Sequence, residues 1–497
     1  MDKNILLIIA DDLGRNLGVC GESKVKTPNL DDLAAQGTYF DMAFASTASC
    51  SGSRSVIQSG LHTHQTGQLG LLRGFQGLHY FTTFDHVDTS PKVFNGLGYL
   101  TGIINKVHVG PAECYPWRVR EESDTRDVAW AAERSAAFFE RAKEEKKPFF
   151  LTVGYIDPHR DLTRGGFGNT QDYKGVQHLS YDPKDVTIPF FLSDVPEVRQ
   201  ELSEYYSAVW RLDQGVGMLL NELSKAGLDD NTLVMFTSDN GPPFVNSKST
   251  LYDAGVRLPM IIRVPGGRTG VVNPNLISFI DILPTFLDWA GYGSVKGNRK
   301  GRSVLPIMNE TRELDEWGHV FGSHTFHELT AYYPTRYMRT KRFKYHRNVA
   351  WQLDFPFPGD LYGALSWEGM RNAEPAMIGK RPVANYIRRG PEELFDLEAD
   401  PEEVRNLAKE PEYQEQLLEC RKALEQWQLD TEDPWYFRDG ISTRVIFNHI
   451  DAGMKMPDRW DFDVENPGSK DGSQMAHSFQ EVRGRGRWVI RTSHYRI

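Results

Sequence analysis

The sequence predicts an α/β fold in which a large, mostly parallel sheet is sandwiched by helices, with a smaller C-terminal α+β subdomain packed on it. Over the first two thirds of the chain, short runs of Ile, Leu and Val alternate with longer segments of helical periodicity. That alternation is typical of a parallel sheet covered on both faces. Three of the apolar runs end directly in polar residues, and from about residue 302 aromatic and polar residues crowd together instead.

The elements of the large sheet are expected in chain order. Residues 5–10 are a short apolar run that predicts a buried first strand, and residues 28–36 predict a helix with Leu30, Leu33 and Ala34 on one face. Further strands are expected at residues 99–104, 149–155, 232–236 and 260–264, and further helices at residues 128–143 and 196–226.

The last third of the chain predicts a different architecture. Residues 393–397 predict a strand that runs into the turn at Asp400-Pro401, and residues 406–427 predict a helix. We therefore expect an α/β domain over residues 1–301, an α+β subdomain over 302–440 and an extension over 441–497. The extension is rich in charge, Gly and Pro and has little periodicity, which favours extended or poorly ordered chain.

Bulk composition narrows the class of protein. The net charge of −10 argues against nucleic-acid binding, which needs clustered Lys and Arg, although a local basic pocket can still bind an anion. Four cysteines are too few for a disulfide scaffold and fit a reduced setting. The first apolar run is too short for a signal peptide or a membrane span. We expect a cytoplasmic protein without a membrane partner, and a secreted form trimmed of its leader stays an alternative.

Polar residues follow three of the expected strands. These are Asp11-Asp12, Asp157-Pro158-His159 and Ser238-Asp239-Asn240-Gly241. One acid in such a place is commonly a helix cap, but functional residues of parallel sheets collect at the carboxyl ends of strands. Three polar ends together indicate a functional site.

The acids of these segments predict a metal site. Asp11, Asp12, Asp239 and Asn240 offer only oxygen ligands, and no Cys/His spacing suits zinc. Oxygen ligands favour Ca²⁺, with Mg²⁺ or Mn²⁺ as alternatives. Adjacent carboxylates at the end of a buried strand also repel each other unless a cation joins them.

The segment Ser49-Cys50-Ser51-Gly52-Ser53-Arg54 is the next candidate. Taken alone, Cys50 is more often a buried small residue than a reactive one. Arg54 follows at helical spacing, where its charge could lower the thiol pKa or bind an anion.

The order of these motifs resembles the sulfatase family, within the alkaline-phosphatase-like superfamily. The sequence carries Asp11-Asp12, Cys50-x-x-Ser53-Arg54 with Ser59-Gly60 after it, Lys106-x-His108, Asp157-Pro158-His159 and Ser238-Asp239-Asn240-Gly241. Within the family it is most similar to the sulfamidase branch, for example at His327-Glu328-Leu329-Thr330, Tyr333-Pro334-Thr335-Arg336 and Asp433-Pro434-Trp435. The resemblance covers about residue 4 to about residue 440 and not the tail.

This resemblance implies a reaction and a set of roles. Cys50 would be oxidised to formylglycine by a formylglycine-generating enzyme, and its hydrated form would attack sulfur and then expel sulfate. Arg54, Lys106 and Lys248 would bind the diol and sulfuryl oxygens, and His108 would handle the diol proton. His159 would protonate the leaving group. The metal would occupy the four oxygen ligands already named.

The implied substrate is a small sulfated compound, with N-sulfated glucosamine as the leading expectation, cleaved at a sulfamate (N–S) or sulfate ester bond. His64, Arg160, Glu328 and Arg336 are expected to bind the substrate. For His64 a helix cap is the alternative, and for Glu328 and Arg336 an internal ion pair. A homodimer stays open.

The chain departs from the family pattern at Gly52, where Pro or Ala is usual. Gly loosens the segment that the converting enzyme reads in extended form. Two alternatives follow if Cys50 stays a thiol: a phosphonate monoester or phosphodiester hydrolase, or a catalytically inactive protein that binds sulfated ligands.

Overall fold

The computed structural model describes residues 3–72, 81–293, 298–436 and 452–453. Apart from Ala452 and Gly453, the expected extension over residues 441–497 lies outside the described residues, so its predicted disorder stays a prediction. In the described part of the chain, no helix is both long and apolar enough to span a membrane.

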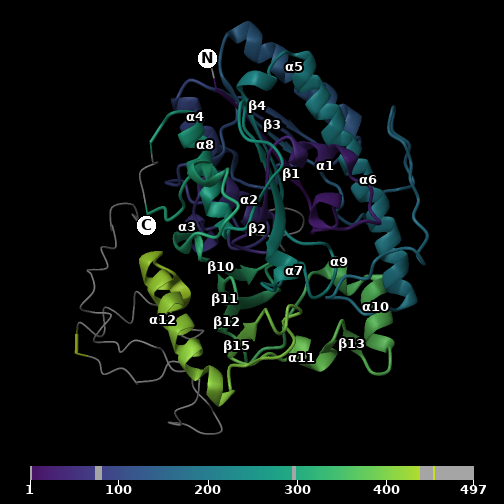
Figure 1. Cartoon of the computed structure of the whole chain (residues 1–497), viewed down its shortest axis with the longest axis vertical. Coiled ribbons are helices and arrows are strands. Elements are labelled where there is room, and N and C mark those ends of the chain that lie inside the picture. The colour runs from purple at the N-terminus through teal and green to yellow at the C-terminus, as the bar shows by residue number, and fades with distance from the viewer. Residues whose placement is uncertain (1–2, 73–80, 294–297, 437–451, 454–497) are drawn as a thin grey trace.

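A large sheet organises the first two thirds of the molecule (Figure 1). In the described residues it has nine strands in the order β4-β3-β5-β1-β6-β7-β2-β8, with β9 beside β2. All neighbours are parallel except β7, which is antiparallel to β6 and to β2. Their bounds are β1 Asn4–Ala10, β2 Thr38–Phe44, β3 Leu100–Asn105, β4 Val119–Glu122, β5 Phe149–Gly154, β6 Thr232–Ser238, β7 Arg257–Arg263, β8 Val271–Asn273 and β9 Ile277–Ser278. The predicted mostly parallel sheet is confirmed.

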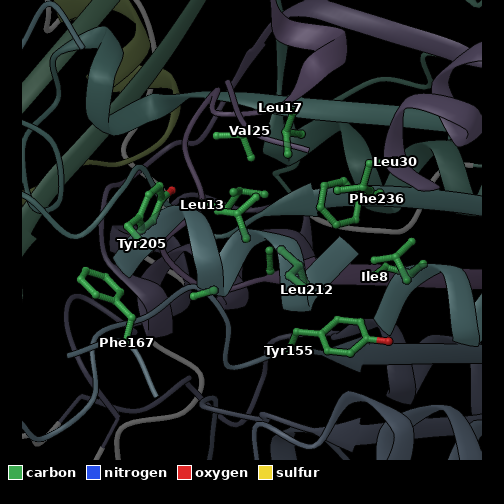
Figure 2. Close-up of a cluster of buried hydrophobic side chains, with 14 of the residues drawn as sticks. Ile8, Leu13, Leu17, Val25, Leu30, Tyr155, Phe167, Tyr205, Leu212 and Phe236 are labelled. Atoms are coloured by element: carbon green, nitrogen blue, oxygen red, sulfur yellow. The ribbon is translucent and has the colours of Figure 1, made fainter. Parts of the chain in front are cut away.

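Helices cover both faces of this sheet, which is why β1 is apolar from Ile5 to Ala10. Leu6 and Ile8 pack into one core with α1 (Pro28–Ala35), α5 (Val128–Glu145) and α6 (Pro196–Lys225). The alternate residues Ile5 and Leu7 pack into a second core with α2 (Cys50–Ser59), α4 (Ser90–Gly96) and α8 (Ile282–Trp289). Figure 2 shows part of the first core, where Ile8 of β1 and Phe236 of β6 lie near Leu212 of α6. Alternate side chains of a strand point to opposite faces of the sheet, so β1 contributes to two separate cores.

Local signals explain where the long helices begin. Pro28 and Pro196 stand at the first position of α1 and α6, where a missing N–H costs nothing. At the start of α5 the Asp127 carboxylate accepts hydrogen bonds from the backbone N–H groups of Ala129 and Trp130.

A smaller antiparallel sheet follows, in the order β10-β11-β12-β15 (His319–Phe326, Tyr332–Thr340, Phe343–Asn348 and Glu392–Asp396). Helix α12 (Gln414–Asp430) packs on it through Leu417, Leu424 and Trp427. The remaining elements are short: α3 Thr63–Thr66, α7 Asp253–Val256, α9 Gly359–Tyr362, α10 Leu365–Asn372, β13 Met377–Ile378, β14 Arg381–Pro382 and α11 Val383–Ile387. The expected α+β subdomain is confirmed as an architecture, whereas its start at residue 302 stays a prediction.

One predicted helix was wrong at its start. Residues 406–413 do not continue α12, because Asn406 uses its side chain to bridge the Glu392 carbonyl and the Leu394 N–H of β15. Pro411 then opens a separate 3₁₀ turn before α12 begins at Gln414. The other predicted strands and helices agree with the structure to within about three residues at either end.

Candidate active site

Four neighbouring strands bring polar residues to one edge of the large sheet. β3, β5, β1 and β6 are adjacent and parallel, so their carboxyl ends lie at the same edge. Each strand is followed within a few residues by predicted site residues: Lys106 and His108 after β3, His159 after β5, Asp11 and Asp12 after β1, and Asp239 and Asn240 after β6.

The four expected metal ligands are completely buried and lie against one another. The backbone N–H of Asp12 donates to Asp239 Oδ1 at 3.1 Å, and Asn240 Nδ2 donates to Asp12 Oδ1 at 2.7 Å. Burial and the nearby Asp11 carboxylate raise the pKa of Asp239 to about 7. Carboxylates crowded into a dry site repel each other, so positive charge is needed to hold them ionised.

Two oxygen atoms indicate where a cation fits. Asp11 Oδ1 and Asn240 Oδ1 are buried and have no hydrogen-bond partner in the described part of the chain. Asp11, Cys50 and Asp239 each offer a ligand atom, and these atoms lie within 4.8 Å of one another. A buried oxygen without a partner is costly, and oxygen atoms are the ligands that Ca²⁺ and Mg²⁺ prefer. The residues present therefore fit a hard divalent cation.

Cys50 is the first residue of α2, and its side chain is buried beside this cluster. Burial raises the pKa of its thiol to about 12, against the opposing effect of the Lys106 ammonium. The surrounding side chains therefore do not activate Cys50 as a thiolate. The amino end of α2 carries unpaired backbone N–H groups, which favours a negatively charged group at this position.

The structure supplies a packing reason for Gly52. A Cβ at this position would lie 3.1 Å from Thr47 Cγ2 and 3.3 Å from Thr63 Cγ2. These distances are shorter than ordinary van der Waals contacts, so the two threonine methyl groups leave little room for the usual Pro or Ala. Gly52 is thus matched to its neighbours in the folded state.

Two cations approach the acids from the side of α2 and β3. Arg54 Nε donates to Asp239 Oδ2 at 2.8 Å, and Lys106 Nζ donates to Asp11 Oδ2. Arg54 Nη2 is buried and has no partner in the described residues. An unpaired guanidinium nitrogen beside Cys50 fits an anionic ligand such as a sulfuryl group.

Lys248 and His159 lie next to Asp12 and to each other. Lys248 Nζ donates to Asp12 Oδ2 at 2.8 Å and lies 3.2 Å from His159 Nε2. His159 Nδ1 lies 2.6 Å from the Arg160 carbonyl. A carbonyl only accepts, so Nδ1 carries the proton of the neutral ring and Nε2 points toward Lys248. Burial and the Lys248 ammonium lower the pKa of His159.

His108 belongs to the same pocket. Its Nδ1 is buried without a hydrogen-bond partner in the described part of the chain, and the charges of Lys106, Asp11 and Arg54 act on it. Burial and the Lys106 ammonium lower its pKa well below the ordinary value, which keeps the ring neutral. A neutral imidazole in this pocket can accept a proton.

Three residues expected to bind substrate lie in internal contacts instead. Arg160 donates through both Nη atoms to the Glu201 carboxylate and through Nε to the Pro243 carbonyl. Arg336 forms a buried ion pair with Asp433 at 2.7 Å, the alternative that the sequence left open. His64 donates to or accepts from Thr431 Oγ1 at 3.0 Å and lies edge-on to Trp427. The structure does not bring them into the cluster, and their role in substrate binding stays a prediction.

Two residues that were not predicted as site residues border the pocket. Asp360, in α9, accepts a hydrogen bond from Lys248 Nζ at 3.1 Å. His327 lies 3.0 Å from the hydroxyl of Ser49, immediately before Cys50, and is buried. Glu328, which was expected at the sugar pocket, lies next to α9, with Oε1 3.7 Å from the position of a Cβ on Gly359. Only the chain fold brings these residues to the site, since no local pattern marks Asp360 as functional.

Comparisons with known proteins agree with this geometry. The sulfatase family model matches residues 3–292, and the model for the C-terminal part of N-sulphoglucosamine sulphohydrolase matches residues 245–354. The human N-sulphoglucosamine sulphohydrolase is 36% identical over 463 residues, which cover 87% of this chain and 91% of that protein. An ulvan-active sulfatase of Formosa agariphila is 28% identical, covering 85% of this chain and 74% of that protein.

The fold is also that of solved sulfatase structures. One of them, described as a complex with its substrate D-glucosamine-2-N,6-O-disulfate, has a TM-score of 0.63 at 20% identity and covers 87% of this chain and 99% of that chain. At this identity the likeness shows the fold alone. The two family models and the human relative establish the identity: the chain belongs to the sulfatase family.

Proposed function

We propose that this protein is a sulfohydrolase that cleaves the sulfamate bond of N-sulfoglucosamine or a closely related N- or O-sulfated sugar. The observation that carries this proposal is the cluster itself, in which Cys50, four oxygen ligands and three cations meet in one buried pocket. The name of the human relative and the substrate of the similar structure support a sulfated glucosamine as the substrate.

The pocket is suited to a tetrahedral anion. Arg54, Lys106 and Lys248 direct fixed positive charge toward the space beside Cys50. Charge that spreads over the sulfuryl oxygens in the transition state is stabilised by such preorganised cations, because little water competes in a buried site. A divalent cation, which we propose to be Ca²⁺, would supply further polarisation of these oxygens when bound by Asp11, Asp12, Asp239 and Asn240.

Proton transfer falls to the two histidines of the pocket. His108 is neutral and can take a proton from the nucleophile. His159 directs Nε2 into the pocket. Once Nε2 is protonated, it can donate that proton to the departing nitrogen or oxygen. A bound sulfuryl anion next to the ring favours the imidazolium form, which offsets the lowered pKa of the free site.

Formylglycine at position 50 would supply the nucleophile that the buried thiol does not. Conversion requires a formylglycine-generating enzyme to read the segment around Gly52 while it is extended. Gly52 fits the crowded pocket beside Thr47 and Thr63, so its presence has a reason in the folded state that does not depend on the conversion.

The proposal is tested by mass spectrometry of the Cys50 peptide together with turnover of glucosamine 2-N-sulfate. Formylglycine appears as a loss of about 18 Da against the thiol, and sulfate release from the sugar is expected in the same preparation. An unmodified thiol with turnover of aryl phosphonates would instead establish the phosphonate hydrolase. A thiol with binding but no turnover of either substrate would establish the inactive binder.

A further inference from the structure

Asp360 occupies a distinctive place at the outer side of the pocket. Its Oδ2 accepts a hydrogen bond from Lys248 Nζ at 3.1 Å, and its Oδ1 accepts one from the Leu361 N–H at 3.0 Å. Its side chain is 28% exposed, whereas the Lys248 side chain between Asp360 and Asp12 is 1% exposed. Lys248 therefore separates the buried acids from a carboxylate that can still be reached from outside.

The position of His159 relates Asp360 to the leaving group. Asp12, His159 and Asp360 offer polar atoms that all lie within 4.8 Å of one another. If His159 Nε2 protonates the leaving atom, a substituent one bond farther along the substrate comes within hydrogen-bond reach of the Asp360 carboxylate. The sulfuryl group is expected nearer Cys50, where the charges of Lys106 and Lys248 both act.

The ionisation state of Asp360 determines which substrate substituents it can bind. The Lys248 ammonium holds the pKa of Asp360 well below its ordinary value despite burial, so the group is ionised at neutral pH. An ionised carboxylate accepts hydrogen bonds and cannot donate them. A hydroxyl or ammonium group on the neighbouring substrate atom is therefore bound, and an anionic group is repelled.

Glu328 adds to this selectivity. It lies beside α9 on the same rim, so a second carboxylate borders the approach to Asp360. The cations of the pocket are turned inward, since Arg54 and Lys106 pair with the buried Asp239 and Asp11. The rim thus carries two carboxylates, and the Arg54 and Lys106 charges are directed away from it.

We propose that Asp360 is a specificity-determining residue, which selects leaving groups with a hydrogen-bond donor next to the sulfated atom and rejects those with an anion there. This inference rests on the proposed sulfohydrolase function. It names a substrate class: monosulfated units, such as sugars, whose neighbouring position carries a free hydroxyl group.

A purely structural role for Asp360 predicts a different result. If the carboxylate only held Lys248 in place, its loss would weaken sulfuryl binding for every substrate by the same factor. Selectivity among leaving groups would then not change. The two roles are therefore separated by a ratio of rates rather than by a rate.

The experiment compares aryl sulfates that differ in one substituent. The probes are phenyl sulfates with a hydroxyl or a carboxylate at the ortho position, and the two para isomers, in which the same substituent lies out of reach of Asp360. The ortho-to-para ratio of kcat/KM removes most of the difference in leaving-group basicity. The proteins are the full-length wild type, Asp360→Asn and Asp229→Asn, each with its metal and with its residue-50 modification measured.

Asp229→Asn is the matched control. Asp229 is 36% exposed and pairs with Arg263 at 3.0 Å, much as Asp360 pairs with Lys248. It precedes β6, whereas the site follows the other end of that strand, about 20 Å away. This variant removes one paired carboxylate without touching the pocket.

In the wild type we expect the ortho-to-para ratio to be higher for the hydroxyl probe than for the carboxylate probe. Asp360→Asn should shift the two ratios toward each other by about tenfold or more, the worth of one hydrogen bond to a charged group. Asp229→Asn should leave them unchanged.

Equal losses on all probes in Asp360→Asn, or a wild type that does not discriminate between the ortho substituents, would overturn the inference and leave the proposed function intact. The second comparison needs no variant, so it decides the matter even if Asp360→Asn does not fold. A converted, metal-loaded wild type without turnover of any aryl sulfate or of glucosamine 2-N-sulfate would refute the proposed function itself.

Discussion

Asp11 and Asp239 are the two acids that border the candidate metal position most directly. Each is buried next to a cation, Lys106 for Asp11 and Arg54 for Asp239, yet Asp11 Oδ1 keeps no partner in the described residues. The Lys106 ammonium and the Arg54 guanidinium therefore compensate the charge of the two acids only in part. The remaining oxygen is directed at the position where we place the metal.

Replacing Asp239 should remove the metal. Asp239→Asn keeps the size of the side chain but loses one negative charge and one ligand oxygen, so we expect Ca²⁺ affinity to fall by about 100-fold or more. The metal content after gel filtration, measured by elemental mass spectrometry, checks this. Asp229→Asn should keep its metal, and an Asp239→Asn protein that retained the ion in full would remove Asp239 from the ligand set.

His159→Ala should slow substrates in proportion to how much they need an acid. For a sugar sulfamate or alkyl sulfate, with a poor leaving group, we expect kcat to fall by about 10² to 10⁴. An activated aryl sulfate such as 4-nitrophenyl sulfate leaves without protonation and should lose much less. Steady-state kinetics on both substrates decide this, because an equal loss would show that His159 does not act as the acid.

At the scale of elements, a buried ion pair joins the small sheet to the segment after α12. Arg336 on β11 donates to both oxygens of Asp433, at 2.7 and 2.8 Å, and both side chains are completely buried. The Arg336 guanidinium holds the pKa of Asp433 below its ordinary value. This pair holds the segment after α12 against β11.

Arg336→Met should destabilise the protein by about 3–5 kcal/mol at pH 7, because it leaves a buried carboxylate without its partner. In the variant the Arg336 charge no longer opposes the effect of burial, so the pKa of Asp433 rises and the group takes up a proton as the pH falls from 7 toward 4. In the wild type the lowered pKa keeps Asp433 ionised over that range, and its stabilisation is lost only below about pH 4. The difference in unfolding free energy should therefore shrink between pH 7 and pH 4.

Denaturant unfolding of both proteins at several pH values measures this difference. Arg199→Met is the control, since Arg199 pairs with Asp194, whose side chain is 57% exposed. It should cost about 1 kcal/mol or less. A pH-independent difference for Arg336→Met would contradict the assigned ion pair.

For the whole molecule, the two sheets depend on each other. Tyr337 of β11 donates to the Ala45 carbonyl, and Val320 of β10 packs into the second core of the large sheet. Asp253, between the sheets, pairs with Arg339 and Lys344 at 3.1 and 2.7 Å. Asp360 reaches the site from the same C-terminal part of the chain. The expected division at residue 301 therefore separates segments that share a core.

A fragment of residues 1–301 should not fold on its own. It would expose part of the second core and leave Asp253 without its cations. We expect the fragment to lack a cooperative thermal transition in calorimetry, while the full chain shows one. A fragment that unfolds cooperatively would show that the division at residue 301 separates independent folding units.

The sequence by itself determined the parallel core and most of the catalytic cluster. Runs such as residues 5–10 specify buried strands through local periodicity, and polar residues directly after them, such as Asp11 and Asp239, must then meet at one edge. The strands β10 to β12 were not predicted individually, because their aromatic and polar residues carry no clear period of two.

Only the tertiary structure decided what surrounds that cluster. Asp360 and His327 reach the pocket from segments more than 270 residues beyond Cys50. Arg160 and Arg336 form buried pairs with Glu201 and Asp433, which no local motif predicts. Local spacing determines which face of an element a side chain takes, but contacts between distant segments depend on how complete elements pack. The Asp360 and Glu328 carboxylates, which we propose to select the substrate, are brought to the pocket by such contacts between distant segments.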